Sequence, residues 1–182
     1  MRVALGVCAL LLVGCTGDDG VTAYFAVPGS TAADDFYALP YPNDLRRHED
    51  GSLDLSEFPT NSVIAQTVRD IAQRDNDGFG LNAAMFARFS AELDPASLPT
   101  PADSMQAGAS VYLVDVDPDS PDRGTRVPIV ATFHPEGPQT IGPDRLVARP
   151  FPGFPLADGT TYALVITNRV HTLDGGNVGA QA

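Results

Sequence analysis

The sequence is poor in cysteine and contains no tryptophan. Of its 182 residues only Cys8 and Cys15 are cysteines, and both lie within the first fifteen positions. Beyond Cys15 the chain therefore cannot form a disulfide framework, a cysteine-ligated zinc site or a cysteine nucleophile. Because tryptophan is absent, the hydrophobic core must consist mainly of Phe, Tyr, Leu, Val and Ile.

Positive charge is also scarce, and lysine is missing altogether. The 11 basic residues are all arginines and face 23 acidic residues, for a formal net charge of −12. A chain this acidic repels phosphate backbones, so we expect no nucleic-acid binding. The excess of carboxylates is typical of a protein that is soluble outside the cell or that binds divalent cations.

The N-terminal residues have the features of a secretion signal. Arg2 is followed by an uncharged run from Val3 to Val13, which is shorter than the roughly 20 residues of a membrane-spanning helix. The run ends in Leu12-Val13-Gly14-Cys15, which resembles the bacterial lipobox. We predict that residues 1–14 are a signal peptide and that the thiol of Cys15 receives a diacylglycerol. The alternative is an ordinary signal peptide with an incidental cysteine.

A lipid on Cys15 would anchor the protein to a membrane, since each buried methylene contributes about 0.8 kcal/mol. Thr16 follows the cysteine in place of the aspartate that usually retains lipoproteins in the inner membrane. We therefore expect a bacterial cell-envelope protein, in the outer membrane rather than the inner. Residues 15–35 are small and polar, which predicts a lipidated, flexible tether.

Residues 36–80 are predicted to form a Pro-rich segment and one helix that pack on the following domain. Pro40 and Pro42 exclude a helix there. The segment 40–47 also mixes aromatic, acidic and basic side chains, so it is either structural or a ligand site. A helix is predicted over Ser62–Arg74, capped by Thr60 or Asn61. Its apolar residues lie near one face: Val63, Ile64, Val68, Ile71 and Ala72.

Residues 81–182 are predicted to form an all-β domain. Apolar residues alternate with polar ones in five runs, at 84–90, 110–116, 126–133, 145–151 and 160–167. Pro- and Gly-rich turns separate the runs at short spacing, which is typical of a β-sandwich. The apolar loop 151–155 either packs on this domain or, if exposed, forms a docking patch.

Six short motifs in this region resemble a bacterial Ig-like domain of the S-layer type. They are Phe89-Ser90, Leu93-Asp94-Pro95-Ala96-Ser97-Leu98, Ser110-Val111-Tyr112-Leu113, Pro155-Leu156-Ala157-Asp158-Gly159-Thr160-Thr161-Tyr162, the strand that follows, and Asp174-Gly175-Gly176-Asn177. The resemblance covers residues 84–178 and implies an Ig-like β-sandwich. Its role would be structural or adhesive, with a following domain, surface proteins or glycans as partners.

A second resemblance concerns the first half of the chain. Pro40-Tyr41-Pro42-Asn43-Asp44-Leu45, then Asp50-Gly51-Ser52-Leu53 and Asp77-Gly78-Phe79, are similar to the N-terminal domain of bacterial surface lipoprotein lipases. That family has phenylalanine in place of Tyr41 and a shorter stretch before Asp77. The resemblance implies a hydrolase domain later in the chain, so that the sequence would be truncated after Ala182.

We predict no catalytic residue within the 182 positions. A Gly-x-Ser-x-Gly nucleophile elbow is absent. The three histidines, His48, His134 and His171, are far apart in the sequence and are expected to be surface residues. The chain is therefore interpreted as a binding or structural module, and whether a hydrolase follows in the native protein stays open.

Acidic side chains offer two candidate metal sites. Asp115, Asp117, Asp119 and Asp122 surround Pro118 at the short spacing that lets carboxylates converge on calcium. The loop lacks the glycine and distal glutamate of an EF-hand, so a solvated hairpin is the competing interpretation. The run Asp75-Asn76-Asp77-Gly78 is a weaker candidate, since it also suits the end of a helix. Calcium is the only cofactor that the sequence suggests.

Overall fold

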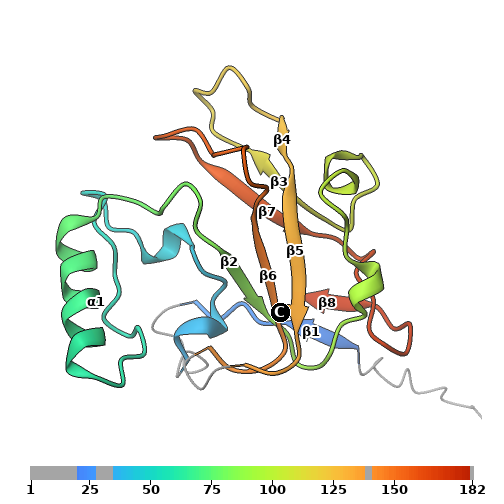
Figure 1. The fold of residues 1–182 in the computed structure, drawn as a ribbon, viewed down its shortest axis with the longest axis horizontal. Helices are drawn as coiled ribbons and strands as arrows, with labels where there is room; N and C mark the ends of the chain where they lie inside the picture. The colour runs from blue at the N-terminus through green and yellow to red at the C-terminus, as the bar shows by residue number, and fades with distance from the viewer. Residues whose placement is uncertain (1–19, 28–34, 138–140, 181–182) are drawn as a thin grey trace, which may run out of the picture.

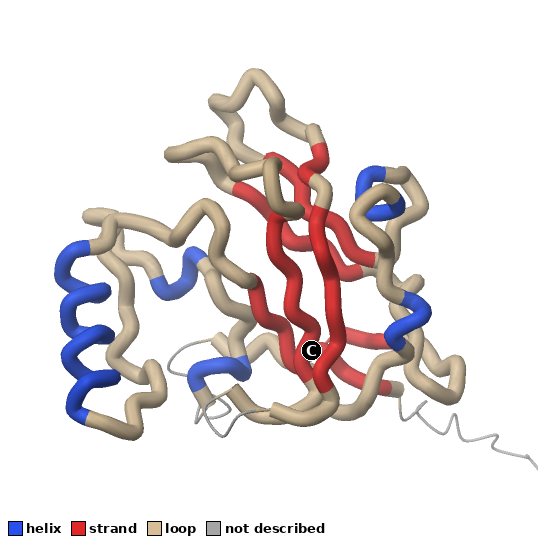
Figure 2. The backbone as a smooth tube through the Cα atoms, viewed as in Figure 1, coloured by secondary structure: helices blue, strands red, loops and turns tan. Residues whose placement is uncertain are grey.

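The computed structural model describes residues 20–27, 35–137 and 141–180, and these form strands with one α-helix (Figures 1 and 2). The strands are β1 (Val21–Ala23), β2 (Met85–Arg88), β3 (Val111–Asp115), β4 (Arg126–Val127), β5 (Ile129–His134), β6 (Arg145–Pro150), β7 (Tyr162–Ile166) and β8 (Val178–Ala180). The helix is α1 (Val63–Asp75), and the 3-10 helices are η1 (Phe36–Ala38), η2 (Asp44–Arg46), η3 (Pro95–Ser97) and η4 (Asp103–Met105). The all-β prediction is confirmed.

Two antiparallel sheets form the body of the protein. One has the strand order β2-β6-β5 and the other β4-β3-β7. A third, two-stranded pair joins β1 and β8 in parallel. The Tyr24 N–H donates to the Arg88 carbonyl and the Ser90 N–H to the Thr22 carbonyl, so β1 lies along the end of β2.

Pro128 divides the predicted strand 126–133 between the two sheets. Before it, β4 pairs with β3, and after it β5 pairs with β6. Proline has no N–H to give to a ladder, so it interrupts the strand at the point where the chain crosses from one sheet to the other. The periodicity of the sequence runs through this position and could not show the crossing.

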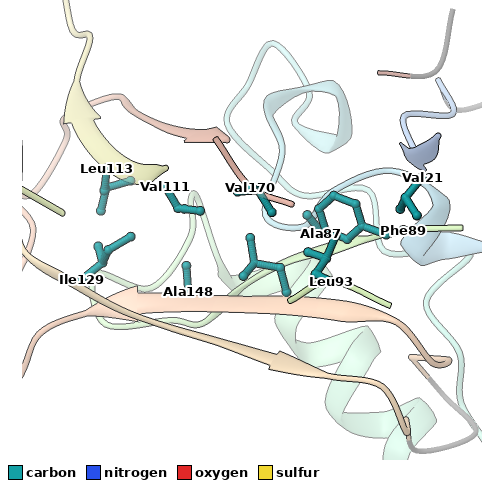
Figure 3. Close-up of a cluster of buried hydrophobic side chains, with 10 residues drawn as sticks. Val21, Ala87, Phe89, Leu93, Val111, Leu113, Ile129, Ala148 and Val170 are labelled. Carbon is teal, nitrogen blue, oxygen red and sulfur yellow. The ribbon is translucent and has the colours of Figure 1, made fainter. Parts of the chain in front are cut away.

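The core lies between the two sheets. Val111 and Leu113 of β3 face Ile129 of β5 and Ala148 of β6 (Figure 3). These side chains are at most 1 % exposed. Phe89 and Leu93, just after β2, extend the same cluster toward Val21 (Figure 3). Alternate residues of β3 are buried, as a strand with one core face requires.

The predicted tether contains a strand. Residues 21–23 form β1, and Val21 is 9 % exposed within the main core. The prediction of a flexible tether is therefore wrong for these residues, because a three-residue strand is too short to show periodicity. Cys15, the signal peptide 1–14 and residues 28–34 lie outside the described residues. The short strand β8 was missed for the same reason as β1.

The segment before α1 forms a second, aromatic core. Phe36 and Tyr37 are buried, and their rings meet edge to face with centroids 5.0 Å apart. Tyr41 pairs with Phe86 of β2 through an isolated antiparallel bridge, so this cluster is fastened to the sheet. The bridge attaches the segment 36–58 to β2.

Helix α1 is present as predicted, but its orientation differs from the expectation. The N-cap is Ser62, whose Oγ accepts from the Ala65 N–H at 3.1 Å, and not Thr60 or Asn61. Ala72 packs against the aromatic core. The large aliphatic side chains point outward instead: Val63, Ile64, Val68 and Ile71 are 45–78 % exposed. Among the described residues no helix has the length and apolarity to cross a membrane.

Candidate functional site

The acidic loop after β3 is held together by its own carboxylates. Asp115 is 3 % exposed, and its carboxylate accepts from the Asp117 N–H at 2.9 Å and from the Ser120 hydroxyl at 2.5 Å. Asp117 accepts from the N–H groups of Asp119 and Thr161, at 2.9 and 3.0 Å. These hydrogen bonds fasten the loop to the segment that leads into β7.

The same hydrogen bonds lower the pKa of Asp117. The Asp119 N–H contributes most, followed by the Thr161 N–H, because both stabilise the ionised form. The side chains of Asp119 and Asp122 are exposed. In the described part of the chain no three His, Cys, Asp or Glu side chains are grouped so as to hold a metal ion. Calcium binding at Asp115, Asp117, Asp119 and Asp122 stays a prediction.

The weaker acidic candidate lies at the end of α1. Asp75 is the last helical residue and Asn76 is the C-cap. The Arg74 guanidinium donates to both carboxylate oxygens of Asp75, at 2.6 and 2.7 Å. Those hydrogen bonds lower the pKa of Asp75. Asp77 contributes its backbone carbonyl to the Arg47 guanidinium at 3.1 Å. This run ends the helix and ties it to the Pro-rich segment.

Arg46 in the Pro-rich segment is buried, which the sequence did not indicate. Its guanidinium lies 3.9 Å from the centroid of the Phe36 ring and bonds to the Phe36 carbonyl. An ion pair with Glu57, 3.2 Å away, balances its charge. A flat guanidinium stacks well on an aromatic face, so Arg46 serves as part of the aromatic core.

Tyr37 and Tyr41 share this aromatic environment. Burial raises the pKa of Tyr37 to about 12, with smaller contributions from Tyr41 and Asp35. Burial also raises the pKa of Tyr41, against the opposing effect of Arg46. Asn43 caps η2 by accepting from the Leu45 N–H at 3.0 Å. These contacts support the structural interpretation of segment 40–47 over the ligand-site interpretation.

A shallow polar cavity of about 420 Å³ lies beside the start of β3. Asp103 and Arg169 contribute the charged groups of its lining, with Gln106 and Ser110 nearby. Asp103 already accepts from the Thr100 hydroxyl at 2.6 Å. Ser110 donates to the Ser97 carbonyl at 2.6 Å. The polar groups of the cavity are thus largely engaged within the protein.

Exposed apolar side chains are concentrated at two places. The first is the aliphatic face of α1, defined by Val63, Ile64, Val68 and Ile71. Helix α1 lies at the end of the molecule away from the sheets (Figure 1). The second is the loop 151–155, where Phe151 and Phe154 are 38 % and 52 % exposed with ring centroids 6.2 Å apart. The loop thus extends from the domain.

The three histidines stay apart in the fold and are exposed, in agreement with the expectation that they are surface residues. His134 ends β5, where its Nε2 lies 3.1 Å from the Thr132 hydroxyl. His171 belongs to the turn before β8 and pairs with Asn177.

In comparisons with protein families, curated proteins and solved structures, none matches the chain.

Proposed function

We propose that the protein is a lipid-anchored surface module whose Ig-like domain has a binding or structural role. The lipobox-like Leu12–Cys15 supports the anchor. Strand β1 begins at Val21, six positions after Cys15, and an extended chain covers at most about 3.6 Å per residue. The lipid would therefore hold the folded domain within about 20 Å of the outer membrane.

The order of the Ig-like motifs supports the domain type. Asp94 lies six positions after the end of β2 and caps η3 by accepting from the Ala96 N–H. Tyr162 begins β7 with its ring against the core, and its hydroxyl accepts from the Ala157 N–H at 3.1 Å. The turn at Asp174–Gly176 precedes β8, with Gly175 at a φ of 83°. These three motifs stand at turns or strand starts, which supports the proposed domain type.

The proposed binding role rests mainly on the exposed aliphatic face of α1. A helix in a globular protein normally turns such residues inward, toward the core. Contiguous exposed apolar side chains are typical of interaction sites. The four side chains of the face are uncharged, and the charged residues of α1 pair with each other, Arg69 with Asp70 at 2.8 Å and Arg74 with Asp75 at 2.6 Å. A partner would therefore be held mainly by burial of apolar surface.

Fatty-acid labelling in the producing bacterium tests the anchor. The wild-type protein should incorporate label, and Cys15→Ser should abolish it. Cys8→Ser is a matched control, because this cysteine lies in the predicted signal peptide and should leave labelling intact. Equal labelling of the Cys15→Ser variant and the wild type would exclude lipidation at this residue.

Photo-cross-linking on intact cells tests the binding role. A photoreactive residue at Val68 should give discrete adducts, since this side chain is 60 % exposed on the aliphatic face. The same residue at Gln66, which is exposed on another side of the helix, should give few. A lack of adducts at Val68, or the same adducts at both positions, would contradict the proposal.

The second candidate is the non-catalytic N-terminal part of a larger secreted lipase or esterase of the α/β-hydrolase kind. The packing of the Pro-rich segment favours it, because the Tyr41–Phe86 bridge joins both resembling regions into one unit. The mass of the native protein from its own membrane tests this candidate. A mass equal to residues 15–182 plus lipid would exclude it, and a larger mass with esterase activity would support it.

A further inference from the structure

Strand β7 has one edge that no described strand pairs with. The Thr167 N–H donates to the Ser110 carbonyl, and the Val116 N–H donates to the Thr161 carbonyl. In an antiparallel pair these bonds recur at every second residue. The odd-numbered residues of β7 therefore bond to β3, while Tyr162, Leu164 and Ile166 direct their N–H and C=O groups to the opposite side. None of those groups has a hydrogen-bond partner among the described residues.

This edge lacks the usual protection against pairing with another chain. Natural edge strands are commonly interrupted by proline, a bulge or charged side chains. The sequence Tyr162-Ala163-Leu164-Val165-Ile166 has none of these. Other edges are better covered: Tyr41 bridges to β2, and the Ile129 N–H of β5 donates to the Ser104 hydroxyl at 3.2 Å.

We propose that β7 pairs antiparallel with β7 of a second copy of this chain. A two-fold axis at Leu164 would place Leu164 opposite itself and Tyr162 opposite Ile166 of the second copy. Each of the three residues offers one donor and one acceptor, so every unpaired group of the edge would find a partner. The two β4-β3-β7 sheets would become one continuous sheet, with a self-complementary interface.

The charges at the two ends of β7 favour this direction of pairing. Acidic Asp117 and Asp158 lie at its beginning, and Arg169 follows its end. Arg169 is exposed and belongs to none of the ion pairs between described residues. The antiparallel register brings Arg169 to Gly159 of the second copy, next to Asp158. A parallel pairing would instead set like charges side by side.

Disulfide cross-linking in the cell envelope tests the register. Ala163 and Val165 lie on the outer face of β7, because their neighbours Tyr162, Leu164 and Ile166 pack against the core. In the proposed dimer Ala163 opposes Val165 of the second copy, at a Cα separation of about 4.5 Å that a disulfide can bridge. The full-length double variant Ala163→Cys/Val165→Cys should give a covalent dimer on a non-reducing gel after mild oxidation.

Three controls distinguish specific pairing at β7 from non-specific oxidation. Ala163→Cys alone should give little dimer, because its partner position remains valine. Thr132→Cys/His134→Cys places the same pair on exposed positions of β5, and it should stay monomeric. The wild-type chain reports on any reaction of Cys15. Equal cross-linking of the β5 pair, or no dimer from a protease-resistant β7 pair, would overturn the proposal.

Sedimentation equilibrium of the wild-type protein tests the dimer without any substitution. The proposal predicts a species with twice the mass of one chain, and the mass should fall with dilution. Lysine on the outer face of an edge strand hinders pairing, so Val165→Lys should shift the equilibrium to monomer, while Thr132→Lys should not. A wild-type protein that stays monomeric at high concentration would refute the dimer and leave the proposed lipid anchor untouched.

Discussion

At the scale of single residues, the polar groups with the clearest structural roles fasten loops to the sheets. Asp115 is the best example, since its buried carboxylate receives two hydrogen bonds from the loop that follows β3. Arg46 has a similar role in the aromatic core. Both residues belong to segments in which the sequence suggested a ligand site. Their side chains instead bond to the protein itself.

Replacing Asp115 tests this role. Asp115→Ala leaves the Asp117 N–H and the Ser120 hydroxyl without their acceptor and should cost about 1–3 kcal/mol of unfolding free energy. Asp119→Ala, an exposed position in the same loop, should change it by less than about 0.5 kcal/mol. Urea unfolding measures both. A wild-type melting temperature that rises in millimolar calcium, with the rise abolished in both variants, would favour the calcium interpretation of this loop.

Ionisation of Tyr37 should lower the free energy of unfolding at high pH. Its pKa is raised from 10.0 to about 12 in the folded protein, mainly by burial. The folded state therefore retains a proton that the unfolded state releases, and the stabilisation is complete below pH 10 and lost as pH rises to about 12. Tyr37→Phe should flatten the fall in unfolding free energy over this range. An unchanged slope in the variant would show that Tyr37 does not cause it.

At the scale of elements, the sequence predicted which segments are strands more accurately than how they are arranged. Alternating apolar residues located β2, β3, β6 and β7 to within two residues, because each strand has one core face. The same pattern could not show that Pro128 divides one run between two sheets. The helix was located from its spacing, but which face turns inward depends on tertiary contacts that the sequence does not display.

The outward orientation of α1 makes a simple prediction about stability. Val68→Gln should change the free energy of unfolding by less than about 0.5 kcal/mol, because the side chain is 60 % exposed. Leu146→Ala is the matched core substitution, and it should cost about 2–5 kcal/mol because Leu146 is fully buried. Chemical denaturation compares the two. A loss above 1 kcal/mol for Val68→Gln would mean that the aliphatic face packs against the domain.

At the scale of the whole molecule, the surfaces available for binding are the features least accessible from sequence. The aliphatic face of α1 and the free edge of β7 are made of residues that their sequence pattern assigns to a core, whereas the sequence left open whether the loop 151–155 is exposed. Their exposure follows from how the elements meet. The sequence does predict the anchor directly, since the lipobox-like motif is a local signal that needs no tertiary structure.

The central claim is that the β domain is attached to a membrane through a lipid on Cys15. Its most direct test is the mass of the N-terminal tryptic peptide of the protein purified from its own membrane. We expect a peptide that begins at Cys15, ends at Arg46 and carries the added mass of a diacylglycerol. A peptide that begins elsewhere, or an unmodified cysteine at position 15, would contradict it.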